Sequence, residues 1–276
     1  MTDASITSQP VQLLHTGPDG NTCVKDDVVA REEPMEIRVE GRSVAVVMRT
    51  PGHDEDLAAG FLVSEGVIAR PTDLLEVSQC PSTGNQHGNV VDVLLGKAVE
   101  NWDSLTRNVF STSSCGLCGK ATLESIFQRF PTLPSQGWKV PRQLISTLPS
   151  TLRAAQSTFN STGGLHACGL FDLEGRLILA REDVGRHNAL DKILGWAVRR
   201  DLLPLQNHLL LLSGRVSFEM MQKALAGGIS LVAAISAPSS LAVEMAQKSG
   251  QTLIGFLRGS SMNLYTHPER VRDCPE

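Results

Sequence analysis

The feature that most constrains the fold is a regular alternation of short apolar runs and helix-forming segments near the C-terminus. Apolar runs at 208–213, 230–236 and 252–258 alternate with segments at 216–228 and 239–250, and only short loops join them. Runs that are apolar along their whole length are typical of a buried parallel sheet covered by helices. This half of the chain is therefore predicted to have an α/β fold.

The region just before this alternation predicts another hairpin and another helix. Residues 165–180 form two apolar runs that turn at Glu174 and Gly175. The segment 187–200 places its apolar residues on one face, as an amphipathic helix does. Prolines at 131, 134, 141 and 149 interrupt the preceding stretch. We expect a linker there with one or two short helices and a subdomain boundary near 131–141, giving a C-terminal subdomain over 136–276.

The N-terminal part predicts a smaller α/β subdomain over 31–135. Residues 1–30 are polar and rich in turn residues, with neither strand nor helix period, so we expect a flexible arm. The expected elements of the subdomain are a hairpin at 36–49, an acidic helix at 53–66, a strand at 89–95 and a helix at 120–130.

Charge and composition exclude several classes of function. The formal net charge is -4, so the chain lacks the basic field that nucleic-acid binding through phosphates requires. No apolar run reaches membrane-spanning length, and the first residues do not resemble a secretory signal. We therefore expect a cytoplasmic protein that binds neither nucleic acid nor a membrane.

The six cysteines include one pair with a motif spacing, Cys115 and Cys118. The pair lies in a Gly- and Ser-rich turn before a predicted helix, whose N-terminal dipole, together with Lys120, would lower the pKa of a thiol. Two thiols three residues apart can pass a persulfide between them, or release it by forming a disulfide. The pair is predicted to be reactive.

Two other readings of the pair remain open. A single CxxC often supplies half of a four-ligand zinc site, and His166 and Cys168 would be the candidates for the other half. A thioredoxin-like exchanger also places CxxC between a strand and a helix, but it normally does so early in a compact chain. The other cysteines, Cys23, Cys80 and Cys274, form no second pair and are expected to have no role.

Three loops of the alternating region have the composition of a ligand site. Loops 213–217, 236–240 and 256–261 combine small residues with hydroxyls, and two of them carry an arginine. Loops at the carboxyl ends of parallel strands meet at one sheet edge, where ligands bind. We predict that a phosphorylated ligand binds there, with its phosphates near Arg258 and a helix N-terminus. The polar run 181–188 and His166 are further candidates to line the pocket.

Several motifs, in order, resemble one known family. The strings SSCGLCG, GGLHACGL, REDVGRHNALDK, SGRVSFEMMQKA, ISAPSSLAVEMA and GFLRGSSMNLYTHPERV are similar to those of the FdhD family of formate dehydrogenase accessory sulfurtransferases. The resemblance extends from about residue 30 to the C-terminal region. It implies a cytidine-deaminase-like layered sheet in the C-terminal half, and a homodimer.

The resemblance also implies a function. A cysteine desulfurase supplies sulfur to the CxxC pair, and the protein delivers it to bis-molybdopterin guanine dinucleotide, the molybdenum cofactor of formate dehydrogenase. Cys115 matches the persulfide-bearing cysteine and Cys118 its companion. The cofactor-binding segment corresponds to Phe256, Leu257, Arg258, Gly259, Ser260 and Ser261, although relatives often have a second basic residue where Ser260 and Ser261 stand. We expect no metal to be held by the protein itself.

The deaminase-like fold suggests a rival enzyme class. Zinc deaminases use H-x-E followed later by P-C-x-x-C. Here the CxxC comes first, no proline precedes it, and Cys168 stands where the glutamate is needed, so we reject deamination. A chaperone that only holds the cofactor or the apoenzyme would leave the cysteine pair without a purpose, although holding and sulfur transfer are compatible.

Overall fold

The computed structural model describes residues 4–80, 88–99, 102, 127, 129–135 and 137–273. Its largest sheet has six strands in the order β13-β12-β11-β10-β8-β9. The strands are β8 (His166–Phe171), β9 (Leu177–Asp183), β10 (Leu209–Leu212), β11 (Leu231–Ala234), β12 (Thr252–Arg258) and β13 (Ser261–Thr266). β10, β11 and β12 run parallel, as predicted, whereas β8 pairs antiparallel with both β10 and β9, and β13 pairs antiparallel with β12. The sheet is therefore mixed.

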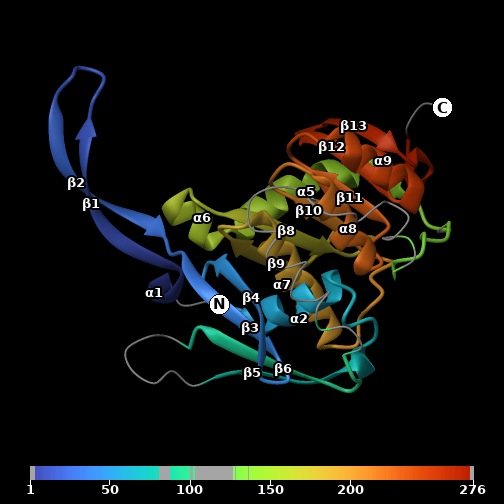
Figure 1. Cartoon of the computed structure of the whole chain (residues 1–276). Coiled ribbons are helices and arrows are strands. Elements are labelled where there is room, and N and C mark those ends of the chain that lie inside the picture. The colour runs from blue at the N-terminus through green and yellow to red at the C-terminus, as the bar shows by residue number, and fades with distance from the viewer. Residues whose placement is uncertain are drawn as a thin grey trace.

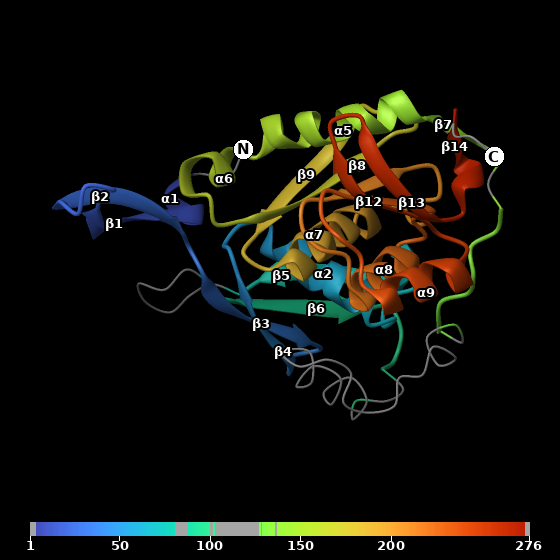
Figure 2. The same ribbon diagram turned by 90° about the horizontal axis from the view of Figure 1, so that it is seen from above.

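Helices cover both faces of this sheet because its central strands are apolar on both sides. In β10, Leu209 and Leu211 belong to the buried cluster beneath α5 (Arg142–Ala155), and Leu210 and Leu212 belong to the cluster on the opposite face. On that opposite face lie α7 (Arg186–Val198), α8 (Phe218–Ala226) and α9 (Ser240–Ser249). Figure 2 shows α5 on one side of the sheet and α7, α8 and α9 on the other.

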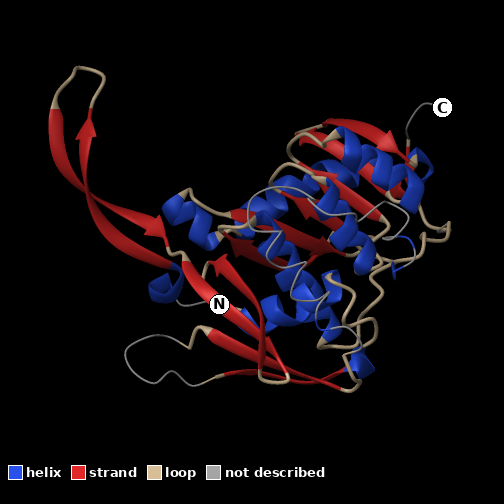
Figure 3. Ribbon diagram, viewed as in Figure 1, coloured by secondary structure: helices blue, strands red, loops and turns tan. Residues whose placement is uncertain are grey.

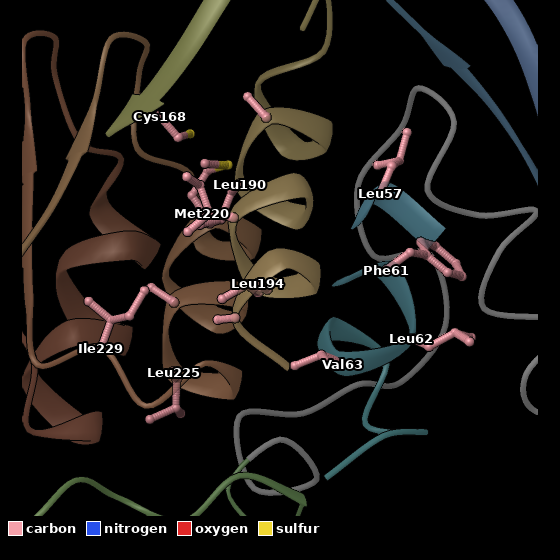
Figure 4. Packing of buried hydrophobic residues seen from close by; sticks show 14 of the residues in the cluster. Leu57, Phe61, Leu62, Val63, Cys168, Leu190, Leu194, Met220, Leu225 and Ile229 are labelled. Carbon is pink, nitrogen blue, oxygen red and sulfur yellow. The ribbon is translucent and has the colours of Figure 1, made fainter. Parts of the chain in front are cut away.

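A second, four-stranded sheet lies on the far side of these helices, in the order β4-β3-β6-β5. Its strands are β3 (Glu33–Val39), β4 (Arg42–Arg49), β5 (Leu74–Gln79) and β6 (Val90–Leu95). Between it and α7 lies α2 (Asp54–Ser64), which is nearly all buried (Figures 2 and 3). Leu57 and Phe61 of α2 share one buried cluster with Leu190 of α7 and Met220 of α8, so both sheets close over a common core (Figure 4).

Two glycines allow α2 and α7 to cross with their backbones in contact. A Cβ built on Gly195 of α7 would lie 1.7 Å from the Asp56 carbonyl oxygen, and one on Gly60 of α2 would lie 1.8 Å from the Asp191 carbonyl oxygen. Real Cβ atoms do not make such contacts, so only glycine fits at both positions. This crossing fixes α7 against the N-terminal part of the chain.

The N-terminal arm forms a regular hairpin, which the absence of a strand period did not predict, and its flexibility stays a prediction. After α1 (Ala4–Thr7), β1 (Ser8–Thr16) and β2 (Thr22–Ala30) pair antiparallel along their whole length. This hairpin projects away from the two sheets (Figure 1). Among the described residues it is attached at its base, where Arg31 N donates to Thr7 O and the Thr158 hydroxyl of α6 (Ser157–Thr162) donates to that of Thr7.

The other elements compare with the predictions as follows. The hairpins, the strands and helices of the C-terminal alternation, the acidic helix and α7 are confirmed, with bounds shifted by a few residues. Strands β5 and β13 were missed, as were the short pair β7 (Val140–Pro141) and β14 (Val271–Arg272) and the 3-10 turns η1 (Pro71–Asp73) and η2 (Pro268–Arg270). The predicted helix at 120–130 lies almost wholly outside the described residues, and the domain boundaries stay predictions.

Candidate functional site

The three loops predicted to bind a ligand lie together at one edge of the six-stranded sheet. Val216 N donates to Ala237 O at 3.1 Å, and Ser239 N donates to Val216 O at 2.9 Å. The third loop is attached by Phe256 N, which donates to Ser236 O at 3.1 Å. The prediction that the carboxyl ends of β10, β11 and β12 carry these loops side by side is therefore confirmed.

Helices begin directly after two of these loops, so their free N–H groups face the same edge. Ser217 is the N-cap of α8, and Ser239 is the N-cap of α9. The Ser239 hydroxyl accepts from Ala242 N at 3.2 Å. Gly255 lets β12 approach the second loop, since a Cβ there would lie 2.9 Å from Cδ of Pro238.

Strands β8 and β9 bring the polar run 181–188 to this edge. His166 opens β8 opposite Asp183, which closes β9. The Ser213 hydroxyl accepts from Ala167 N at 2.8 Å, and Ser213 N donates to Ala167 O at 3.0 Å, which joins β8 to the first loop. Helix α7 then starts at Arg186, so Arg186 and His187 lie in its first turn, beside the loop.

The turn between β9 and α7 is held by the carboxylate of Asp183, which is completely buried. It accepts from Gly185 N at 2.9 Å, from Asn188 Nδ2 at 2.9 Å and from Thr50 N at 3.2 Å, and it forms an ion pair with Lys192 Nζ at 2.7 Å. These donors and the ion pair offset the free-energy cost of burying the charged carboxylate. The network therefore fixes where α7 begins and presents its first turn to the edge.

The two partners of this network from outside the polar run were not predicted. Thr50 follows β4 and lies 133 positions before Asp183 in the chain, so no local pattern could have linked them. Lys192 was read only as part of the helix, although it lies four residues after Asn188 and so on the same helix face. Its Nζ also donates to Thr50 O at 2.9 Å.

The histidines at the edge are held in their neutral form. Burial, with further contributions from Lys223 and Arg186, lowers the pKa of His187 to about 4. Burial and the nearby Arg186 guanidinium also lower the pKa of His166. His187 Nε2 lies 4.0 Å from a Glu219 carboxylate oxygen, which is too far for a hydrogen bond. The edge therefore presents cationic guanidinium groups and neutral imidazoles.

The segment predicted to bind the cofactor, Phe256–Ser261, lies at this edge. It ends β12 and turns into β13, so it does not lead into a helix, and no helix N-terminus follows Arg258. Phe256 and Gly259 have positive φ values of 51° and 54°. Arg258 lies over the Phe256 ring with its guanidinium carbon 5.7 Å from the ring centroid, and Arg258 Nε donates to Ile235 O at 3.4 Å.

The cysteines predicted to be reactive, Cys115 and Cys118, lie outside the described residues, as does Cys274. Among those described, Cys23 is exposed, Cys80 is half-buried and Cys168 is buried. Burial raises the pKa of the Cys168 thiol, so this group is inert as a nucleophile. Within the described ranges no group of three or more His, Cys, Asp or Glu side chains has the arrangement of a metal site, and no helix is long and apolar enough to cross a bilayer.

Comparison with known proteins identifies a matching family and several similar proteins. Residues 30–272 match the model of the FdhD/NarQ family. The sulfur carrier protein FdhD of Streptomyces coelicolor is 51% identical over 92% of each chain. The protein of the same name from Mycobacterium tuberculosis is 49% identical over 94% of this chain and 97% of its own. That of Sulfolobus acidocaldarius is 44% identical over 92% and 94%.

A solved structure shares the fold. A crystal structure from Desulfotalea psychrophila, named as that of a formate dehydrogenase accessory protein, superposes with a TM-score of 0.77 and is 26% identical. It covers 96% of this chain and 99% of its own. The mixed α/β architecture, with two sheets around a shared helical layer, is therefore one that a solved relative also adopts.

Proposed function

The chain belongs to the FdhD/NarQ family, and from this membership we propose that it is a sulfur carrier that serves formate dehydrogenase. In this proposal, a cysteine desulfurase loads sulfane sulfur onto Cys115. The protein then hands the sulfur to bis-molybdopterin guanine dinucleotide, which it binds as a substrate before the cofactor enters the apoenzyme. The proposal includes a cytoplasmic location, a homodimer and a cytidine-deaminase-like layering of the larger sheet.

The sulfur step needs only thiolate chemistry. The Cys115 thiolate attacks the outer sulfur of the desulfurase persulfide, a new S–S bond forms on Cys115, and the desulfurase cysteine leaves as a thiolate. If the Cys118 thiolate then attacks the Cys115 sulfur, the products are a disulfide and hydrosulfide. Direct transfer of the outer sulfur to an acceptor thiolate instead leaves Cys115 as a thiolate.

The observation that carries the cofactor part is the meeting of four polar segments at one sheet edge. Backbone hydrogen bonds join the loops 213–217, 236–240 and 256–261, and β8 and β9 add the run 181–188. These segments offer main-chain N–H groups, hydroxyls and guanidinium groups, which are the donors that phosphates and a guanine base accept from. The groups present therefore fit a guanine-nucleotide ligand.

The test of sulfur loading is intact mass after incubation with a cysteine desulfurase and cysteine. The wild-type chain should gain about the mass of one sulfur atom, and dithiothreitol should remove it. Cys115→Ala should gain none while it still folds and still binds GDP. Cys23→Ala, which alters an exposed cysteine of the hairpin, is the matched control and should load normally. Loading of Cys115→Ala at the wild-type level would contradict the assignment of the persulfide to Cys115.

A further inference from the structure

One half of the ligand edge carries cationic and imidazole side chains that the proposed cofactor segment does not include. Arg186 and His187 lie in the first turn of α7, His166 opens β8, and Arg215 lies in the loop that follows β10. Arg258 lies at the other half, at the end of β12. β12 and β10 are two strands apart, so their backbones are separated by about 10 Å, and β8 lies one strand further away.

Two of these side chains, those of His166 and Arg186, lie against Gly214. A Cβ built on Gly214 would lie 3.2 Å from His166 Nδ1 and 3.8 Å from Cδ of Arg186. A residue other than glycine would therefore press against the imidazole. Because Gly214 has no side chain, its backbone stays accessible between His166 of β8 and Arg186 of α7.

The nitrogen atoms here lack partners in the part of the chain that the structure describes. Arg186 Nε and His187 Nε2 are buried and make no hydrogen bond there. Arg186 and Arg215 form no ion pair with any described carboxylate, although other cations of the same region do. A buried donor without an acceptor costs free energy, and a ligand that brings an acceptor to this edge would remove that cost.

Two of the nearby carboxylates already have a lysine partner. Asp183 is paired with Lys192, and Asp191 is paired with Lys223 at 2.7 Å. Glu219 lies 4.0 Å from His187 Nε2. Among the described residues, Glu219 is the nearby carboxylate without a lysine or arginine partner, and it interacts with Arg186 only through the longer-range field that helps to lower the pKa of Glu219. Both guanidinium groups therefore have no described carboxylate in direct contact, and they lie beside imidazoles that can donate a hydrogen bond to an oxygen ligand.

We propose that Arg186, Arg215, His166 and His187 form an anion subsite that binds the phosphate groups of the nucleotide ligand. Arg258 and Phe256, at the other half of the edge, then contact the nucleoside portion. The identity of the ligand rests on the proposed function. The subsite itself is defined by the two guanidinium groups and by the accessible backbone of Gly214. A planar guanidinium binds phosphate oxygens through two parallel hydrogen bonds, which a lysine in the same place would not do.

The test compares three probes, GDP, inorganic pyrophosphate and guanosine, by calorimetry. Arg186→Gln should raise the dissociation constants of GDP and pyrophosphate ten- to a hundredfold, as expected for one charge-assisted contact. It should leave guanosine binding unchanged. Arg215→Gln alters an exposed side chain, so it keeps the fold, and it should show a weaker effect of the same selectivity. The matched control is Arg176→Gln, at the β8–β9 turn on the opposite edge, where Arg176 pairs with Asp172.

The outcomes separate this subsite from the proposed function. If Arg186→Gln and Arg215→Gln both bind GDP and pyrophosphate like the wild type, while Arg258→Ala weakens GDP, the subsite is wrong and the nucleotide edge stands. If the wild type binds pyrophosphate in an Arg186-dependent manner but binds no GDP, the subsite stands and the nucleotide assignment fails. Equal losses for GDP and guanosine in a folded Arg186→Gln protein would also overturn the subsite, because a phosphate contact cannot affect guanosine.

Discussion

The crossing of α2 and α7 allows a quantitative test, the substitution Gly195→Ala. The new Cβ would lie 1.7 Å from the Asp56 carbonyl oxygen, whereas ordinary van der Waals contact begins at 3.4 Å. The helices would have to separate by about 1.5 to 2 Å, and neither atom belongs to a flexible side chain that could move instead. Separation loosens the buried cluster that Leu57 and Phe61 share with Leu190.

The expected loss follows from two opposing effects. Overpacking of a close-packed core typically costs 1 to 3 kcal/mol and sometimes more, and a backbone clash lies at the upper end of that range, at about 3 kcal/mol. Alanine is better than glycine in a helix interior by about 1 kcal/mol, which offsets part of it. We therefore expect Gly195→Ala to lower the free energy of unfolding by about 2 kcal/mol, or the melting temperature by about 4 to 8 °C.

The assay is urea and thermal unfolding followed by circular dichroism. Gly137→Ala is the control, because nothing lies within 4 Å of a Cβ at Gly137 and that change should be close to neutral. Gly60→Ala should cost about as much as Gly195→Ala, and the double variant should cost less than the sum, because one separation relieves both clashes. If Gly195→Ala is as stable as Gly137→Ala, the two helices do not cross in backbone contact and the reasoning fails.

Three further predictions concern the site. Arg258→Ala should raise the dissociation constant of GDP roughly ten- to a hundredfold without unfolding the protein, and calorimetry giving equal affinities would mean that the binding segment has been placed on the wrong residues. Stability should fall as pH falls from 6.5 through about 4, because over that range the unfolded chain takes up a proton at His187 that the folded chain does not. His187→Gln should remove about 1 to 2 kcal/mol of that fall. This is less than the full pKa shift of His187 implies, because the ring is partly exposed. Urea unfolding at pH 7 and pH 4.5 measures the difference in the free energy of unfolding. The purified protein should hold no stoichiometric zinc, and elemental analysis that finds one zinc per chain, lost when either Cys115 or Cys118 is replaced, would favour the metal reading of the pair.

The C-terminal elements were predictable because burial imposes a pattern on them. β10 is buried on both faces and has a continuous apolar run, and the apolar residues of α7 recur at helical spacing although the helix is buried nearly all round. The β1–β2 hairpin has no buried face, so apolar Leu14 and Val24 lie opposite each other yet exposed, and the two-residue period is lost. The turn residues Pro18, Asp19 and Gly20 were the available signal for this hairpin.

The part of the site that could be predicted from the sequence is the part that follows from the parallel direction of β10, β11 and β12. Three parallel strands necessarily place the loops 213–217, 236–240 and 256–261 at one edge. The end of β12 was predicted correctly, but the antiparallel strand β13 that follows it was missed, although Met262 and Leu264 do show a strand period. The bonds of Asp183 with Thr50 join residues from distant parts of the chain, and no spacing rule anticipates them.

The shared core also determines when the apolar surface of α2 can be buried during synthesis. β3, α2 and β6 are made first, but the α2 surface that faces α7 stays uncovered until residue 198 has been made. Val198 is synthesised 134 residues after Ser64, the end of α2, so at ordinary elongation rates this apolar surface stays uncovered for about 7 to 27 seconds.

A growing chain in that interval has both an unpaired helix face and the open sheet edge of β4. Such surfaces associate with one another when they meet in other chains. Polypeptides that stop before α7, whether through stalled translation or a premature stop codon, should therefore aggregate instead of surviving as a folded N-terminal fragment. The solubility of the N-terminal half therefore depends on α7, which is synthesised later.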